Sequence, residues 1–119
     1  LSFHLAYDKD GNFIGAAVET FTNKGFSGNI SLMVGILADG TVNNISVLQH
    51  AETPGLGSKM SEPSFKDQFN NKHADSFNFN VKKDGGDVDA ITAATISSRA
   101  FCDAVNRAIS TFENNKGGF

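Results

Sequence analysis

The sequence predicts an α+β domain in which antiparallel β-hairpins pack against a long C-terminal α-helix. Short runs in the first half alternate apolar and polar residues between glycine-containing turns, which is typical of hairpins. An apolar stripe at helical spacing follows between residues 96 and 112. Hydrophobic residues make up 39% of the 119 residues, and 12 glycines add to them, as in an average globular protein. We therefore expect residues 1–119 to form a single domain.

Four strand-forming runs occupy the first fifty residues. The expected strands are Phe3–Tyr7, Phe13–Phe21, Asn29–Leu37 and Thr41–His50. The first two are joined by the turn Asp8–Gly11 and the last two by Ala38–Gly40, and each turn ends in a glycine that tolerates positive φ. A loop of residues that interrupt regular structure, 23–28, is expected between the two hairpins.

Two short elements are predicted in the middle of the chain. Residues Ser61–Phe69 are expected to form a short helix, because Ser61 suits the cap, Pro63 the first turn, and two phenylalanines stand four positions apart. The segment Ser76–Val81 places Phe77, Phe79 and Val81 on one face, which is typical of a short strand.

The C-terminal helix has the clearest periodicity. It is expected to begin near Thr95 and to bury Ile96, Ala100, Phe101, Ala104, Val105, Ala108, Ile109 and Phe112. The start of a helix leaves about four backbone N–H groups without partners and carries partial positive charge. Two interpretations stay open for this end: Thr95 or Ser97 caps it, or it holds an anionic ligand such as a phosphate.

Composition excludes several classes of function. A net charge of −3 does not predict the basic surface that binds nucleic acid. The longest apolar run, 32–38, is far shorter than the ~20 residues of a membrane helix. One cysteine and three scattered histidines predict neither a disulfide nor a metal site. Because the chain begins at Leu1 without a leader, we expect a fragment of a longer protein whose targeting or anchoring segment lies upstream.

The segment Asp89–Thr95 (Asp-Ala-Ile-Thr-Ala-Ala-Thr) resembles the flavinylation motif of FMN-binding domains. In that family the final threonine carries FMN through a phosphoester bond, which a dedicated flavin transferase installs. The resemblance implies covalent FMN at Thr95, cofactor contacts from Thr92, Ala93 and Ala94, and recognition of Asp89 by the transferase. Ala90 and Ala93 stand where glycine is commoner in the motif.

Two further segments support this resemblance in order and spacing. Gly25–Ile30 is similar to the family's glycine-rich segment before its central hairpin. Glu-Thr-Pro-Gly-Leu-Gly at 52–57 resembles the family's loop of that composition, and the cofactor contacts that it implies are Glu52, Thr53, Pro54, Gly55, Leu56 and Gly57. A proline and two glycines give a stiff backbone that a ligand approaches closely. The alternative is an ordinary tight connection between a strand and a helix.

Within this family the chain resembles the G subunit of Rnf-type electron-transport complexes, which is related to the C subunit of the sodium-pumping NADH:quinone oxidoreductase. The resemblance implies a redox carrier without independent catalysis, in a complex that moves electrons between ferredoxin and NAD coupled to ion transport. It also implies partner subunits and a position on the extracytoplasmic (periplasmic) side of the cell membrane, through an upstream anchor. The alternatives are a module that binds flavin or another small ligand non-covalently, and an interaction domain without a cofactor.

Overall fold

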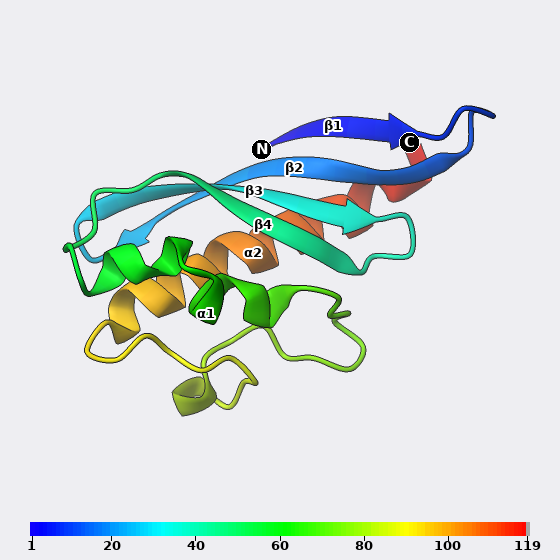
Figure 1. The fold of residues 1–119 in the computed structure, drawn as a ribbon. Helices are drawn as coiled ribbons and strands as arrows, with labels where there is room; N and C mark the ends of the chain where they lie inside the picture. Colours follow the sequence, from blue (N-terminus) through cyan, green and yellow to red (C-terminus); the bar gives the residue numbers. More distant parts are fainter. Residues whose placement is uncertain (119) are drawn as a thin grey trace.

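Four antiparallel strands form one sheet, in the order β1-β2-β3-β4, in the computed structural model, which describes residues 1–118 (Figure 1). The strands are β1 (Ser2–Tyr7), β2 (Phe13–Gly25), β3 (Gly28–Leu37) and β4 (Val42–Gln49). Each strand pairs with the next one along the chain, so the predicted hairpins are confirmed. Phe119, the last residue of the predicted domain, lies outside the described residues.

The junction between β2 and β3 differs from the prediction. Residues 23–28 were expected to form a loop between two separate hairpins, whereas the strands continue through them and Gly25 pairs with Gly28. Only Phe26 and Ser27 remain as a two-residue turn. Glycine makes this tight turn possible: Gly28 has a φ of +124°, and a Cβ on Gly25 would meet the carbonyl oxygen of Gly28.

The long helix α2 (Thr95–Asn115) lies across one face of the sheet and packs mainly on β2 and β3 (Figure 1). Its buried residues form one core with the inward side chains of the strands, including Val18, Leu32 and Val34. The predicted stripe is buried except for Ile96, which is 49% exposed. At 3.6 residues per turn, Ile96 lies roughly 150° from the centre of the face that the buried residues of α2 form, so it stands on the side of the helix turned away from the core.

The predicted short helix over Ser61–Phe69 is broken into three pieces. A 3-10 helix (Gly57–Ser61), the four-residue α1 (Pro63–Lys66) and a second 3-10 helix (Asp67–Phe69) follow one another. The expected cap at Ser61 is wrong, because Glu62 precedes α1 and no side chain caps it. Pro63 stands at the first position of α1, and its missing amide hydrogen and fixed φ end the preceding turn.

The predicted strand over Ser76–Val81 is wrong as well. Phe79 and Val81 are buried as the alternation indicates, but only an isolated bridge joins Val81 to Val88. Side chains, and not a neighbouring strand, accept from the backbone N–H groups here. The Asp87 carboxylate accepts from the Asn78 N–H at 2.7 Å, and the Asn78 side chain accepts from the Asn80 N–H at 3.1 Å. Such local side-chain bonds compete with a sheet ladder.

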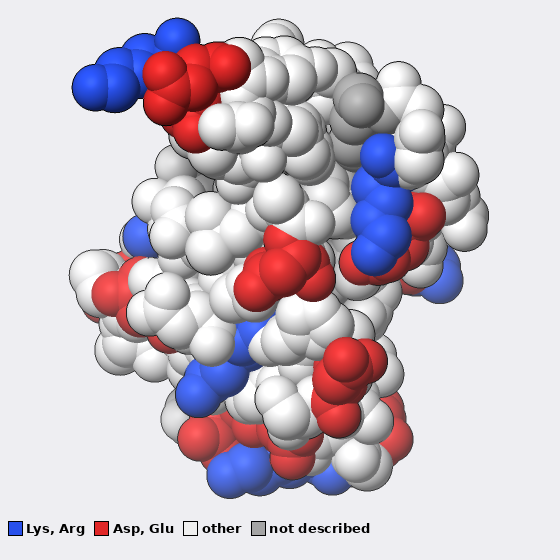
Figure 2. All heavy atoms as spheres, turned by 90° about the vertical axis from the view of Figure 1, so that its right-hand side faces the viewer, with Lys and Arg blue, Asp and Glu red and all other residues white. Residues whose placement is uncertain are grey.

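Charged side chains are dispersed over the end of the molecule that Figure 2 shows, where acidic and basic groups alternate on a largely uncharged surface. Within residues 1–118, none of the helices has the length and apolar character needed to cross a membrane. Across the same residues, no three His, Cys, Asp or Glu side chains gather in an arrangement suited to a metal ion.

Candidate ligand site at the start of helix α2

A pocket of about 360 Å³ opens at the first turn of α2. Three segments that are far apart in the sequence form its walls: the β2–β3 turn, the loop after β4, and the residues at the start of α2. The lining residues are Phe26, Thr53, Leu56, Gly57, Ala93, Ala94, Thr95, Ile96 and Ser97. The tertiary structure therefore brings parts of all three sequence segments to one place.

The helix start that faces this pocket has no side-chain cap. Ala94 is the N-cap residue and Thr95 the first residue of α2, so neither Thr95 nor Ser97 is the cap that the sequence suggested. The Ser98 N–H makes the first helical bond, to the Ala94 carbonyl at 3.0 Å. The N–H groups of residues 95–97 lie ahead of that bond, at the positive end of the helix macrodipole.

Three hydroxyl groups stand in this first turn, and two of them are committed elsewhere. The Ser97 hydroxyl donates to Glu52 Oε1 at 2.7 Å. The Ser98 hydroxyl donates to the Ala94 carbonyl at 2.9 Å and accepts from the Ile91 N–H at 2.9 Å. Thr95 and Ser97 both line the pocket, but Ser97 is buried, as Ser98 is, whereas Thr95 is half-buried. Sequence reasoning missed the role of Ser98, although a serine four positions after a helix start is suited to bond back to that start.

Glu52 lies behind the pocket and not in its lining. Its side chain is 4% exposed and accepts from the Phe26 N–H at 2.7 Å, the Ser27 N–H at 2.8 Å and the Ser97 hydroxyl at 2.7 Å. Burial alone would raise the pKa of Glu52, but these three hydrogen bonds and the nearby His50 hold it below its ordinary value. The carboxylate is therefore charged and engaged with the protein at neutral pH.

The glycines of the loop after β4 are needed for different reasons. A Cβ on Gly57 would meet the Ser97 hydroxyl and would lie 2.8 Å from Glu52 Cβ, so any side chain there would separate the loop from α2. Gly55 has a φ of +77° with open space around it, so its requirement is the backbone conformation. Leu56, between them, is 40% exposed at the pocket.

The segment 89–95 divides between two hollows. Ala93, Ala94 and Thr95 line the pocket just described, whereas Asp89 and Thr92 line a neighbouring hollow of about 310 Å³ together with Lys59 and Gln68. Among the described residues, four of the predicted cofactor contacts do not line this pocket: Glu52, Pro54, Gly55 and Thr92. The chain turns between the two hollows at Ala93, whose φ is +60°.

Asp89 is held through its backbone and exposed through its side chain. The Gln68 side chain donates to the Asp89 carbonyl at 2.9 Å and accepts from the Asp89 N–H at 2.8 Å. The carboxylate lies 2.8 Å from Lys82 Nζ, in an ion pair with both side chains more than half exposed. Sequence reasoning did not single out Gln68, and no local pattern marks a glutamine as the partner of a backbone 21 residues away.

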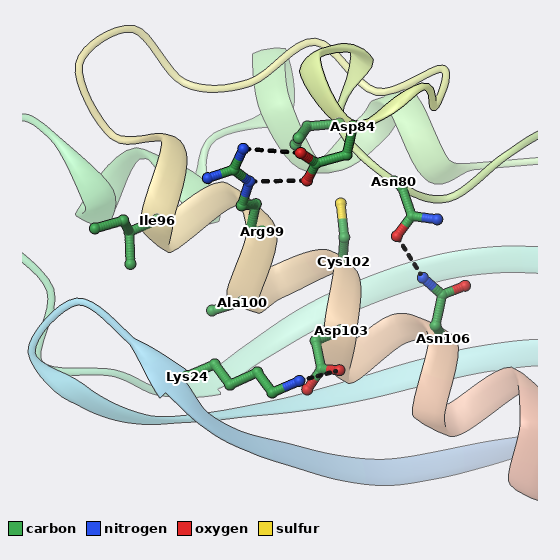
Figure 3. A pocket seen from close by; sticks show the side chains of 10 residues that line it. Lys24, Asn80, Asp84, Ile96, Arg99, Ala100, Cys102, Asp103 and Asn106 are labelled. Atoms are coloured by element: carbon green, nitrogen blue, oxygen red, sulfur yellow. Dashed lines mark hydrogen bonds and ion pairs between the residues drawn. The ribbon is translucent and has the colours of Figure 1, made fainter.

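A second pocket, of about 370 Å³, shares Ile96 with the first and extends along α2 past Arg99 and Cys102 (Figure 3). Its charges are already paired: Arg99 makes two bonds of 2.8 Å to Asp84, and Lys24 lies 3.5 Å from Asp103. Cys102 is buried here, and burial raises the pKa of its thiol to about 12, so the thiol stays protonated. Because its positive charges are already paired with carboxylates, this pocket is less suited to an anionic ligand than the pocket at the uncapped helix start.

The pocket has an apolar rim and lies at an uncapped helix N-terminus, so it suits a ligand that combines an anionic group with an apolar body. The particular family follows from the sequence. The chain belongs to the FMN-binding domain family, whose sequence profile matches residues 25–110. These residues include all three segments that meet at the pocket.

Individual relatives are similar over most of this chain. The G subunit of the ion-translocating oxidoreductase complex of Shewanella baltica is 42% identical over 111 residues, which cover 89% of this chain and 52% of that protein. The protein of the same description from Methanosarcina acetivorans is 38% identical over 117 residues, 97% of this chain and 60% of that protein. The chain therefore spans about half the length of the curated relatives that it matches.

A solved structure shares the fold. The crystal structure of NqrC from Shewanella oneidensis superposes with a TM-score of 0.69 over 97% of this chain and 60% of that one, at 23% sequence identity. This likeness confirms the predicted arrangement of an antiparallel sheet packed against a long C-terminal helix.

Proposed function

We propose that this chain is an electron-transfer domain that carries FMN covalently on Thr95, within an ion-translocating oxidoreductase complex. FMN supplies reversible electron transfer when bound, and the protein supplies its position and surroundings. Support comes from membership of the FMN-binding domain family and from relatives that are named as the G subunit of such a complex.

The pocket has the chemistry that FMN requires. A phosphate is favoured at the start of α2, where backbone N–H groups and the macrodipole meet no capping side chain. Apolar side chains at the rim, Phe26, Leu56 and Ile96, are each at least 40% exposed and suit the faces of an aromatic ring system. We propose that these residues, with Thr53, Gly57, Ala93 and Ala94, hold the cofactor.

The position of Thr95 is the observation that carries the proposal. Thr95 is the first residue of α2 and lines the pocket, whereas the hydroxyls of Ser97 and Ser98 are held in buried hydrogen bonds. Formation of the phosphoester needs an activated donor in which the FMN phosphate is joined to a nucleotide through a phosphoanhydride. The Thr95 oxygen bonds to the FMN phosphorus, the hydroxyl proton leaves, and the phosphoanhydride bond breaks to release the nucleoside monophosphate. We propose that a flavin transferase performs this step during maturation and recognises the exposed carboxylate of Asp89.

Thr95→Val tests the attachment site. The chain is coexpressed with a flavin transferase, denatured, and weighed by intact-mass spectrometry. We expect an FMN-sized mass addition on the parent and none on Thr95→Val, which removes the nucleophile at nearly constant volume. Ser97→Ala and Ser98→Ala should still carry the added mass. Circular dichroism confirms that each variant is folded.

Three results would contradict the proposal. An added mass on denatured Thr95→Val would place the attachment elsewhere. A parent protein that is yellow when native but loses all flavin on denaturation would instead be a non-covalent flavin-binding module. A parent that binds no flavin in either form would leave an interaction domain.

The location and the partners are part of the same proposal. We propose that the domain faces the extracytoplasmic side of the cell membrane, beside the other subunits of the complex, and that a membrane anchor lies in the longer protein. The relatives are named as subunits of an ion-translocating complex, which supports the partner subunits, and they are longer than this chain, which leaves room for an anchor. The side of the membrane follows from the family resemblance alone. Protease accessibility in spheroplasts tests the orientation: we expect cleavage of the domain without lysis, and protection of the domain would contradict the proposal.

A further inference from the structure

We infer that Glu52 is a positioning residue that fixes the β2–β3 turn, so that the ring of Phe26 forms one wall of the ligand pocket. The inference rests on the proposed function only in taking that ligand to be FMN. It assigns Glu52 a place behind the cofactor, where the sequence alone had suggested a direct contact.

The carboxylate of Glu52 joins three segments that the backbone leaves separate. Oε1 accepts from the Phe26 N–H and the Ser97 hydroxyl, each at 2.7 Å, and Oε2 accepts from the Ser27 N–H at 2.8 Å. Glu52 itself belongs to the loop after β4. One buried carboxylate therefore ties the tip of the hairpin to the pocket loop and to the first turn of α2.

Phe26 depends on this arrangement because little else holds it. The residue is one of only two in the turn, its side chain is 66% exposed, and it nevertheless lines the pocket. A large apolar side chain this exposed is not fixed by burial in the core. Its position is set by the backbone of the turn, and the backbone N–H groups of both turn residues are bonded to Glu52.

The arrangement requires a carboxylate and not merely a polar side chain of that size. Three donors meet two oxygens, and Glu52 meets them as a charged acceptor. Glutamine has one acceptor oxygen and an NH₂ group that cannot accept, so at least one donor would face another donor. Glu52→Gln therefore changes the hydrogen bonding with almost no change of shape.

The experiment has one arm without flavin and one arm with it. In flavin-free protein, amide hydrogen exchange at Phe26 and Ser27 is compared between the parent and Glu52→Gln. We expect the exchange of these two amides to accelerate about tenfold or more, because one of them loses its acceptor and the other keeps only a neutral one. Core amides such as those of Leu32 and Val34 should accelerate less, by no more than the loss of global stability measured in urea accounts for. Glu62→Gln, at an exposed glutamate whose side chain does not cap α1, is the matched control.

The arm with flavin uses the protein loaded by coexpression with the transferase. Glu52→Gln and Phe26→Ala should each alter the visible absorption and the fluorescence yield of the bound flavin. If Glu52 acts through Phe26, the double variant should match Phe26→Ala, with no added effect of Glu52→Gln. Should Glu52→Gln fail to fold, Ser97→Ala removes one of the three donors and should change both readouts in the same direction by less.

The outcomes separate this inference from the proposed function. Unchanged exchange at Phe26 and Ser27 would overturn the inference, whether or not flavin is bound. Faster exchange with an unchanged flavin spectrum in every variant would overturn the positioning role and leave a structural one. A parent without covalent flavin would contradict the proposed function, while the exchange arm would still test whether Glu52 fixes the turn.

Discussion

At the scale of single residues, the first turn of α2 distinguishes three hydroxyl groups by their surroundings. Ser98 bonds back to Ala94 and Ile91, Ser97 bonds to Glu52, and Thr95 faces the pocket. The two serines have a structural role in the site. The bonds of Ser98 hold residues 91–94 against the helix, and the bond of Ser97 holds the loop after β4 against it. Of the three residues, Thr95 alone makes no hydrogen bond from its hydroxyl to the described part of the chain, which is why we propose it as the attachment point.

Ala93 has a backbone conformation with positive φ, which glycine adopts more readily than alanine. Its φ of +60° costs a non-glycine residue about 1–2 kcal/mol, whereas glycine loses roughly 0.5–1 kcal/mol of backbone entropy. We therefore expect Ala93→Gly to raise the free energy of unfolding by about 0.5–1 kcal/mol in urea denaturation. Ala90→Gly is the control. Ala90 has no positive φ, so this variant should be slightly less stable than the parent. A loss of stability in Ala93→Gly equal to that of Ala90→Gly would contradict this account.

Asp89 should matter for maturation more than for stability. Its ion pair with Lys82 is exposed, and such pairs contribute little, so Asp89→Ala should lower the free energy of unfolding by no more than about 0.5 kcal/mol. The bonds between Gln68 and the Asp89 backbone remain in the variant. We expect clearly reduced flavin incorporation on coexpression with the transferase, measured by intact mass. Asp75→Ala, at another exposed carboxylate, should incorporate flavin normally, and equal incorporation in both variants would refute the role of Asp89.

At the scale of elements, α2 is held along β2 by polar contacts as well as by the core. The buried Thr20 hydroxyl donates to the Ala104 carbonyl at 3.0 Å, and the Thr22 hydroxyl donates to Asp103 at 2.8 Å. Arg107 donates to the Phe21 carbonyl at 2.7 Å and lies over the Phe21 ring at 4.5 Å. These contacts fix where the helix begins relative to the hairpin tip, and so they place Thr95 near Phe26.

The phenylalanine cluster fixes the other side of α2. Phe101 packs against Phe65 and Phe69 with ring centroids 5.0 Å apart in both pairs, which joins α2 to the segment around α1. Phe101→Ala should lower the free energy of unfolding by about 3–5 kcal/mol, because it removes a fully buried ring and leaves a cavity. Phe26→Ala, at an exposed ring, should change it by about 0.5 kcal/mol or less. Urea denaturation measures both, and similar losses would contradict the assignment of the two rings.

At the scale of the whole molecule, the buried carboxylate links stability to pH. The pKa of Glu52 is lowered in the folded protein, so its charge stabilises the fold fully above its ordinary value of 4.5 and loses this effect as the pH falls through the lowered pKa. We expect the parent to be more stable than Glu52→Gln at pH 7, and the difference in urea midpoint to shrink as the pH falls below about 5 and through the lowered pKa. Other carboxylates titrate in both proteins and cancel in the comparison. A difference that stays constant or grows on acidification would contradict this prediction.

Local sequence signals predicted much of the fold because they act over a few residues. Alternation of apolar residues and glycine turns predicted the hairpins, and the apolar stripe predicted α2 with its start at Thr95. The segment Ser76–Val81 shows where such signals fail: its alternation describes the burial of Phe79 and Val81 correctly, but the Asn78 and Asp87 side chains take the bonds that a strand needs. Likewise, the spacing of Phe65 and Phe69 predicted a common face but not the interruption of the helix around Pro63.

The sequence by itself determined the family, the three segments of the candidate site and the start of α2 near Thr95. These features follow from the identity of the residues and their order along the chain. Only the tertiary structure decided which of those residues meet. It placed Phe26, Leu56 and Thr95 around one pocket, turned Asp89 and Thr92 to another hollow, and set Glu52 behind the wall. The physical reason is that Glu52 meets partners 25, 26 and 45 positions away, and no local pattern records which distant donors a buried carboxylate will satisfy.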